Sequence, residues 1–292
     1  MEWQQIEYFQ TVARVQHITR AARILSISQP ALSRSIARLE GELGVPLFER
    51  EGRSILLNRY GELFLKRANR ILKEYYDGKR EIQDLINPDY GEVSLGFLHT
   101  LGMEKIPDLI GTFRKQHPQL RFSFNQNNSA ALVKQLVSGE FDLCLTTPME
   151  TNVRISWQKL WDEELFVIVP ADHKLANRES ITLDEISEES FIAIKEGNSL
   201  RQIMDQLCEE AGIRPKILFE GEEIHTIAGL VGAGLGVSII PDIKGLDQTK
   251  LSRLHVKWPK SERVIGIAWL DGGYLSAAAI RFKEFVVDYF KK

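Results

Sequence analysis

The chain has 292 residues, enough for two or three domains, and 43% of them are apolar, so sizeable hydrophobic cores can form. No apolar run reaches the roughly eighteen residues that a membrane span needs, and the start, MEWQQIEYFQ, lacks the pattern of a signal peptide. The net charge of −3 divides unevenly: residues 1–87 carry +3 and the remainder −6. The chain therefore has a basic first part and a larger acidic remainder, and the distribution of charge is more informative than its sum.

A first amphipathic helix is predicted from about Trp3 to Val15, with its apolar face supporting the elements that follow. A second short helix starts near Ile18, where Thr19 is expected to be the N-cap. The first of these helices is expected to have a structural role, which is to support the core of the elements that follow.

The third predicted helix begins at Ser28, a capping residue followed by Pro30 in the first turn, and ends at Gly44. Leu32, Ile36, Leu39 and Leu43 form its apolar side, whereas Gln29, Ser33, Arg34 and Arg38 lie on or near the other. From Thr19 to Leu39 there are four arginines and no acidic residue. This division of faces is typical of a helix-turn-helix, whose second helix enters the DNA major groove. A solvated pair of amphipathic helices explains the periodicity equally well.

After Gly44, residues 45–48 are predicted to bury an apolar corner, residues 49–53 to form a turn, and residues 54–57 to return as a short strand. This hairpin is a wing that places Arg50 and Arg53 within reach of phosphates or a narrow minor groove. The alternative is a hairpin with ordinary surface arginines.

One long helix is predicted from Tyr60 to about Ile86, with apolar positions that alternate in spacings of four and three. That heptad seam predicts pairing with a second copy of the helix, although a helix packed on its own body remains the alternative. The seam consists of Phe64, Ala68, Ile71, Tyr75, Gly78, Ile82 and Leu85.

Residues 87–91, Asn-Pro-Asp-Tyr-Gly, form a breaker cluster at which we expect a hinge. Beyond it, short apolar strands alternate with helices, which predicts an α/β body with mainly parallel sheets. Strands are expected at 93–98, 120–126, 141–146, 165–169, 191–194, 217–219 and 237–240, and helices at 103–117, 129–138, 200–211, 224–233 and 275–290.

The string AARILSISQPALSRSIARLEGELGVPLFER resembles the N-terminal signature of the LysR-type transcriptional regulators, and the remaining chain fits that family in length and pattern. The resemblance implies an α/β multidomain protein. A winged helix-turn-helix (1–58) and a linker dimerisation helix (59–87) would precede a two-subdomain effector domain like a periplasmic binding protein (88–292). Subdomain I would span about 92–161 and 265–292, and subdomain II about 162–264, with crossovers near Trp161 and Val264.

For the head, the resemblance implies a homodimer or homotetramer on a pseudo-palindromic operator, with RNA polymerase as a further partner. Gln29, Pro30, Ser33 and Arg34 would lie at the major groove, next to the cap Ser28. Thr19, Arg20, Arg38, Arg50 and Arg53 would position the head on phosphates or in the minor groove. The expected dimer residues are Phe64, Ala68, Ile71, Tyr75, Ile82 and Leu85.

Short polar clusters follow several predicted strands, and most of them lead towards a helix, where free N–H groups favour a polar or anionic ligand. Each cluster alone reads as an N-cap, but their repetition predicts a binding cleft. With the positions that the resemblance adds, the expected effector-binding residues are His99, Thr100, Asn127, Ser129, Thr146, Thr147, Asn198, Ser199, Glu223 and Thr226. Some family members that respond to aromatic acids carry arginine at the position of Thr147, so threonine there disfavours a strongly charged carboxylate.

No catalytic or metal-binding set can be assembled, and no cofactor is expected. Gly232–Gly236 resembles a dinucleotide loop but follows a helix and precedes a strand, the reverse of the required order. Two cysteines, Cys144 and Cys208, make no disulfide framework and favour a reducing, cytoplasmic location. Ser199 stands where peroxide-sensing relatives carry their reactive thiol, so a disulfide switch is not expected.

The second functional hypothesis is a cytoplasmic small-molecule-binding protein with a protein-interaction head. An enzyme is a distant third hypothesis.

Overall fold

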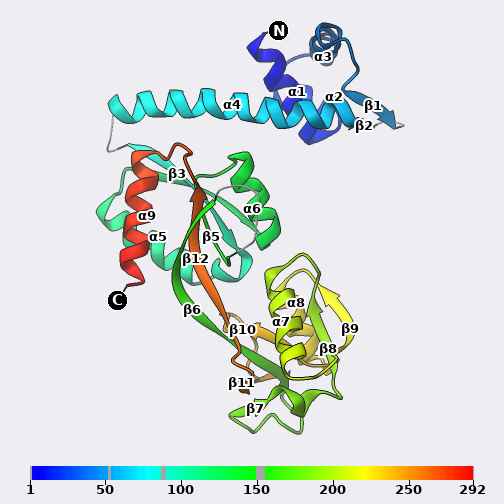
Figure 1. The fold of residues 1–292 in the computed structure, drawn as a ribbon, viewed down its shortest axis with the longest axis vertical. Helices are drawn as coiled ribbons and strands as arrows, with labels where there is room; N and C mark the ends of the chain where they lie inside the picture. The colour runs from blue at the N-terminus through cyan, green and yellow to red at the C-terminus, as the bar shows by residue number, and fades with distance from the viewer. Residues whose placement is uncertain (1, 52–53, 87–89, 149–154, 292) are drawn as a thin grey trace. The chain divides into compact units, whose positions relative to one another are not determined.

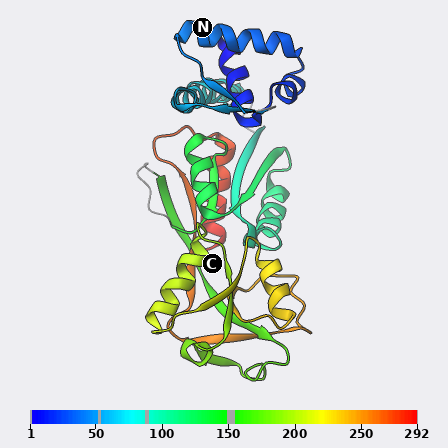
Figure 2. The same ribbon diagram turned by 90° about the vertical axis from the view of Figure 1, so that its right-hand side faces the viewer.

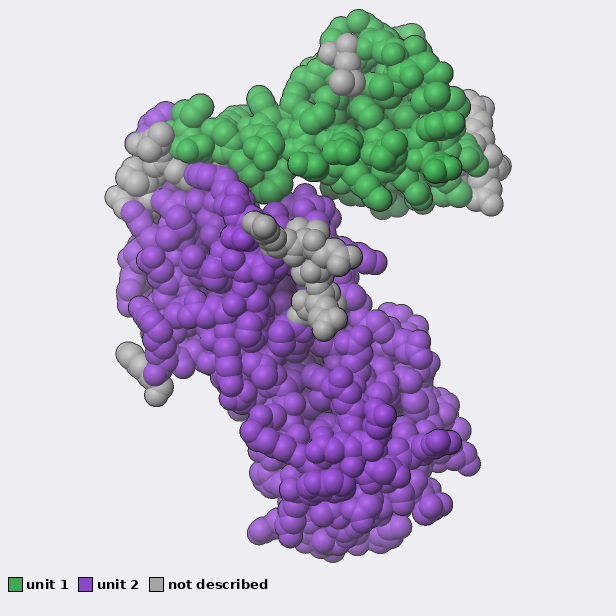
Figure 3. Space-filling view, viewed as in Figure 1, with its two compact units in different colours: residues 1–83 green, residues 84–292 purple. Residues whose placement is uncertain are grey.

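The computed structural model describes residues 2–51, 54–86, 90–148 and 155–291. The chain forms two compact units, residues 1–83 and 84–292, which Figure 3 colours separately. We call them the head and the body and describe each by itself.

The head is a bundle of helices with a small hairpin. It contains α1 (Trp3–Val15), α2 (Ile18–Ile24), α3 (Gln29–Leu43), strands β1 (Phe48–Glu51) and β2 (Ser54–Leu57), and most of α4 (Arg59–Ile86). The two strands pair antiparallel, as expected of a wing. Phe9, Leu32, Leu39 and Leu47 are fully buried between these elements, so most of the apolar face of α3 is used for docking. Leu43 differs from the prediction, because it is exposed at the end of α3.

The caps of α3 match the predictions, whereas the cap of α2 does not. Ser28 Oγ accepts a hydrogen bond from the backbone N–H of Ala31, and Gly44 ends the helix in the left-handed conformation. In α2 the N-cap is His17, whose ring accepts from the Arg20 N–H, and Thr19 lies inside the helix. The prediction of Thr19 as a cap was therefore wrong, because a histidine performed the role that hydroxyl residues usually take.

The body consists of two α/β lobes. In chain order it contains β3 (Gly91–Leu98), a 3₁₀ turn (His99–Leu101), α5 (Lys105–Gln116), β4 (Leu120–Asn127), α6 (Ser129–Ser138), β5 (Leu143–Thr146), β6 (Ile155–Pro170), β7 (Ser180–Thr182), a second 3₁₀ turn (Leu183–Ile186), β8 (Ser190–Ile194), α7 (Ser199–Glu210), β9 (Lys216–Gly221), α8 (Ile224–Gly232), β10 (Ser238–Pro241), β11 (Leu251–Trp258), β12 (Glu262–Leu270) and α9 (Ala277–Tyr289). The predicted helices all occur, with ends shifted by a few residues.

Two long strands join the lobes. Lobe I has the strand order β4-β3-β5-β12, and lobe II is built on the second half of β6, which pairs with β10 and β11. The first half of β6 pairs antiparallel with β12, so both strands run between the lobes side by side (Figure 1). The predicted crossover positions, near Trp161 and Val264, lie in this paired segment, where Ile265 is opposite Trp161.

The expectation of mainly parallel sheets was wrong for this connection. The β3–β4, β3–β5 and β8–β9 pairs are parallel, but every pair that β6 makes with another strand is antiparallel. The chain crosses into lobe II on β6 and returns on β12, and two neighbouring strands that run in opposite directions form an antiparallel ladder.

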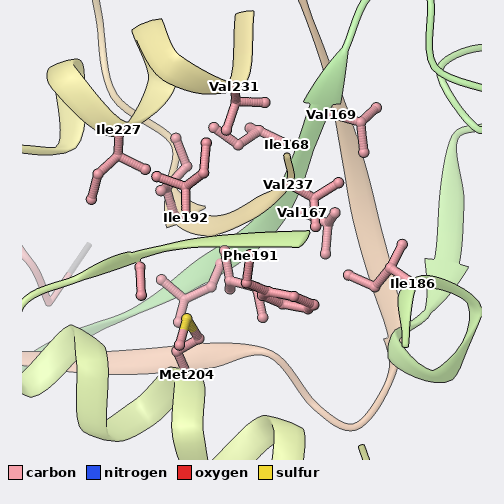
Figure 4. Close-up of a cluster of buried hydrophobic side chains, with 14 of the residues drawn as sticks. Val167, Ile168, Val169, Ile186, Phe191, Ile192, Met204, Ile227, Val231 and Val237 are labelled. Atoms are coloured by element: carbon pink, nitrogen blue, oxygen red, sulfur yellow. The ribbon is translucent and has the colours of Figure 1, made fainter. Parts of the chain in front are cut away.

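Lobe II encloses a continuous apolar core between its helices. Figure 4 shows Ile227 and Val231 of α8 on one side of β8 and Met204 of α7 on the other, with Phe191 and Ile192 between them. Figure 2 shows the same two helices on opposite sides of the lobe II strands. The N-termini of both helices face the end of the lobe from which β6 and β12 lead to lobe I.

Candidate DNA-binding and effector-binding sites

The first turns of α3 present an exposed polar surface. Ser28, Gln29, Pro30 and Arg34 are exposed, and Ser33 is half-buried. Gln29 Nε2 donates a hydrogen bond to Ser33 Oγ at 2.9 Å, one turn further along the helix. Glutamine and arginine on such a surface can pair with base edges, while hydroxyls suit phosphate. The predicted groove residues are therefore brought together on one face.

The surroundings of α3 set its position relative to the wing. Glu40 Oε1 accepts hydrogen bonds from the backbone N–H groups of Leu47 (2.7 Å) and Phe48 (3.3 Å), which fixes the start of β1 against the helix. Thr19 and Arg20 are exposed on α2. The guanidinium of Arg38 lies 3.1 Å from Glu2 and 3.3 Å from Glu42, so DNA phosphates would have to compete with two carboxylates for it.

Parts of the predicted wing and linker helix lie outside the described residues. The backbone of Arg50 belongs to β1, but its side chain, like Arg53 and the side chain of Leu85, lies outside the described residues.

The apolar residues of α4 include a buried set and an exposed set. Ala68 is fully buried in the core of the head, and Phe64 packs against Phe9 with ring centroids 5.0 Å apart. The prediction of Ala68 as a dimer contact is contradicted, because no surface of this residue remains for a partner. A neighbouring exposed stripe consists of Tyr60, Leu63, Ile71, Tyr75, Ile82 and Ile86. Three predicted seam residues, Ile71, Tyr75 and Ile82, belong to this stripe.

A polar cavity of about 180 Å³ lies between the lobes of the body. Lobe I contributes His99, Asn127 and Asn128, which lie at or directly after the carboxyl ends of β3 and β4. Lobe II contributes Asn198 and Glu223, the N-caps of α7 and α8. A smaller adjoining pocket adds Thr100. Five of the predicted effector residues thus converge, because parallel strands end at the same edge of a sheet and the two lobes face each other there.

The cleft also contains charged groups that the sequence reasoning missed. Arg263 on β12 lines the smaller pocket and donates from Nη2 to Thr100 Oγ1 at 2.7 Å, and its guanidinium lies 2.5 Å from Glu163 Oε2. Lys195 and Glu222 form a second pair at 2.7 Å on the rim. The hydrogen bond from Lys195 holds the pKa of the Glu222 carboxyl below its usual value. No local signal marked Arg263, because the fold brings it to Thr100 from 163 residues away.

Four predicted hydroxyl residues are not among those that line the cavity or the adjoining pocket. Ser129, Thr146, Thr147 and Ser199 are all buried and line neither pocket. Ser129 Oγ accepts a hydrogen bond from the backbone N–H of Ser199 at 2.9 Å. The hydroxyl oxygens of Thr146, Thr147 and Ser199 have no hydrogen-bond partner among the described residues. Thr226 is exposed on the first turn of α8 and lines neither of these two pockets.

The two histidines near the cleft have ordinary partners. His99 Nδ1 lies 3.5 Å from Glu223 Oε1, across the cleft. The His225 ring is hydrogen-bonded to the carbonyl oxygen of Lys244 at 3.1 Å.

Other chemistries find little support in the described residues. They contain no group of His, Cys, Asp and Glu side chains that could hold a metal ion, and no helix among them is long and apolar enough to cross a membrane. Cys144 and Cys208 are both buried as free thiols.

Two family models match the chain. Residues 87–291 match the LysR substrate binding domain, and residues 3–62 match the bacterial regulatory helix-turn-helix protein, lysR family. The chain is a LysR-type transcriptional regulator. It is therefore a DNA-binding regulator with an effector-binding domain, and members of this family are not enzymes.

Similar proteins cover either the whole chain or its effector-binding part. The regulator is 58% identical over 292 residues to the uncharacterized HTH-type transcriptional regulator YybE of Bacillus subtilis, with all of both chains covered. The effector binding domain of QuiR, solved in complex with shikimate, is 34% identical with a TM-score of 0.67 and covers 69% of this chain and 98% of its own. Full-length CbnR in complex with its target DNA shares the fold at 23% identity and a TM-score of 0.74, with 98% and 99% of the chains covered.

Proposed function

We propose that this LysR-type regulator binds a pseudo-palindromic operator as a dimer or tetramer, and that a small polar metabolite in the cleft changes how the heads are held on DNA. The main support is the convergence of side chains from both lobes on one cavity, since a ligand there contacts both lobes at once. Such a ligand shifts the regulator between arrangements only by its different affinity for them.

The proposed domains are the winged helix-turn-helix (1–58), the linker helix (59–87) and the effector domain (88–292). Within the head, the exposed face of α3 reads the operator. Gln29 and Arg34 contact base edges, with Pro30 and Ser33 beside them and Ser28 at the phosphate backbone. Contacts with phosphates or with the minor groove are made by Thr19 and Arg20 of α2, by Arg38, and by the wing residues Arg50 and Arg53.

The exposed stripe of α4 is the proposed contact between two copies. A helix that exposes apolar side chains at near-heptad spacing buries them most simply against the same helix of a partner. Two-fold symmetry of the dimer then matches a two-fold operator. Exposed apolar side chains on the strands β4 and β9, Phe124, Leu218 and Phe219, offer the body a second interface, which supports a tetramer.

The effector we propose is small, polar and uncharged or only singly charged. The cavity is smaller than the roughly 300–1,000 Å³ of pockets for drug-sized ligands. Three asparagine amides line it, and the adjoining pocket adds the Thr100 hydroxyl. Its charged lining groups are Lys195, Glu196, Glu222 and Glu223, and the adjoining pocket adds Arg263. Because the effector domain of QuiR was solved with shikimate, a hydroxylated ring carboxylate of that kind is the first ligand to test. The protein would act in the cytoplasm, with RNA polymerase as a further partner.

The first experiment is a footprint on the DNA upstream of the regulator's own gene, at two salt concentrations. We expect two protected half-sites about two helical turns or more apart, and an affinity that falls steeply with salt. Arg34→Ala should lower operator affinity about tenfold or more. Arg114→Ala, an exposed arginine on α5 in the body, is the matched control and should leave that affinity unchanged.

If the folded dimer binds no DNA at low salt, the operator proposal is wrong. If Arg34→Ala and Arg114→Ala bind equally well, the assignment of α3 residues to the major groove is wrong even though the regulator binds DNA.

A further inference from the structure

One buried hydrogen bond connects the two lobes directly. Ser129 is the first residue of α6 in lobe I, and Ser199 is the first residue of α7 in lobe II. Ser129 Oγ accepts from the Ser199 N–H at 2.9 Å, and both residues are more than nine-tenths buried. The N-termini of two helices therefore meet at a single hydroxyl oxygen.

Neither helix uses the Ser129 hydroxyl as its N-cap, because an asparagine caps each of them. Asn128 Oδ1 already caps α6 by accepting from Ala131, and Asn198 Oδ1 caps α7 by accepting from Leu200. The first N–H groups of a helix have no partner within the helix and carry partial positive charge, so they favour an oxygen acceptor. Ser129 supplies that oxygen to α7 from the other lobe.

Two of the other polar contacts between the lobes are exposed ion pairs. His99 and Glu223 are 3.5 Å apart, and Lys244 and Glu104 are 3.4 Å apart, with side chains that are one-third or more exposed. Ion pairs that face solvent contribute little, whereas a buried N–H that loses its acceptor pays the full cost of desolvation. The Ser129–Ser199 bond is thus a buried polar contact that opposes separation of the lobes, together with the bond from Arg263 to Thr100.

We propose that the Ser129 hydroxyl is a built-in latch, which holds the cleft closed by occupying the Ser199 N–H that an oxygen of the effector would otherwise take. This inference rests on the proposed effector role of the cleft and specifies how it is regulated. An effector with an acceptor oxygen competes with Ser129 for that N–H. The buried Ser199 hydroxyl, which has no partner among the described residues, is an additional group that such a ligand could satisfy.

The test is hydrogen exchange of the full-length protein, followed in three segments: the Ser199 region, the start of α6, and buried α9 as a remote reference. Ser129→Ala removes the acceptor and should accelerate exchange at Ser199 about tenfold or more, with α9 unchanged. Ser199→Ala is the matched control. It removes a hydroxyl at the same contact but retains the backbone N–H, so protection of that N–H should persist.

Unchanged protection at Ser199 in Ser129→Ala would overturn the proposal. Equal acceleration in α9 would also overturn it, because the hydroxyl would then support the fold of lobe I rather than the contact between lobes. Loss of protection in Ser199→Ala would show that the hydroxyl, and not the N–H, makes the contact. The readout requires neither DNA nor effector, so a failed operator footprint would refute the proposed function and leave the exchange result standing.

Discussion

Arg263 and Glu163 lie directly opposite each other on the two strands that join the lobes, with guanidinium nitrogens 2.5 Å from the Glu163 carboxylate. The Arg263 side chain is only 2% exposed and that of Glu163 14%. The same guanidinium reaches Thr100 in the cleft. One buried ion pair therefore links the crossover between the lobes to the wall of the cavity.

Removing one partner of this pair should destabilise the body strongly. Glu163→Ala leaves Arg263 buried without its counter-charge, and we expect a loss of about 3–5 kcal/mol in the free energy of unfolding. Asp162→Ala is the matched control on the same strand, because Asp162 pairs with Lys159 in a largely exposed position and should cost at most about 1 kcal/mol. Denaturant melts of the full-length variants measure both. Equal losses would show that the Arg263–Glu163 pair is no more important than a surface pair.

The sequence predicted most of the local structure, because local signals decide it. The third helix was expected from a serine cap, a proline in the first turn and a terminal glycine, and all three act as expected. The long helix was expected from Tyr60 to Ile86 and spans Arg59–Ile86. In the body, Ser129–Ser138 was predicted with its observed ends.

The features that sequence reasoning missed depend on contacts between distant parts of the chain. The first half of β6 is a strand because β12 pairs with it, and no alternation of apolar residues marks it. The burial of Ala68 depends on how α1 packs against α4, which a heptad pattern does not reveal. In the cleft, polar residues at strand ends were predictable, but the fold alone determines that Arg263 reaches the cavity and that Ser129 bonds Ser199 instead of lining it.

A close approach at the start of α4 should make Gly61 indispensable to the head. A Cβ atom there would lie 2.1 Å from the carbonyl oxygen of Leu47 and 2.7 Å from Leu57 Cδ2. Backbone cannot yield as a flexible side chain can, so Gly61→Ala should destabilise the head by about 1–3 kcal/mol despite the better helix propensity of alanine. Gly41→Ala in α3 is the control. A Cβ atom at Gly41 would have no neighbour within 4 Å among the described residues, and this substitution should stabilise by about 0.5–1 kcal/mol. Stabilisation by both substitutions would contradict the predicted clash.

The exposed stripe of α4 should control the oligomeric state. Ile82 is 61% exposed on that helix. If the stripe is the contact between copies, Ile82→Glu places two charges in an apolar seam and should weaken dimerisation about 30-fold or more. Lys66→Glu changes an exposed residue on the opposite side of α4 and should leave the dimer intact. Sedimentation of both variants over a range of concentrations gives the answer, and an unaltered dimer in Ile82→Glu would exclude the stripe as the interface.

Both thiols should be inert in the folded protein near neutral pH. Burial, with a smaller contribution from Asp205, raises the pKa of Cys208 to about 11, and burial alone raises the pKa of Cys144. Only the thiolate reacts, so alkylation of the native protein at pH 8 should be slower than that of the denatured protein by a factor of about a hundred or more, given an unperturbed pKa of about 8.5. The reaction rate of Cys208 should rise about tenfold per pH unit up to about pH 11.

The same shift predicts a loss of stability in alkali. Between the unfolded pKa near 8.5 and the folded pKa of Cys208, the unfolded chain releases the thiol proton while the folded chain retains it. The stability contributed by the neutral buried thiol is therefore fully present below about pH 8.5 and falls as the pH rises towards about 11. Unfolding free energies measured from about pH 8 to about pH 11 should decrease more steeply for the native protein than for Cys208→Ala. Parallel curves, or rapid alkylation of Cys208 at pH 8, would show that this thiol is not held in the buried position described.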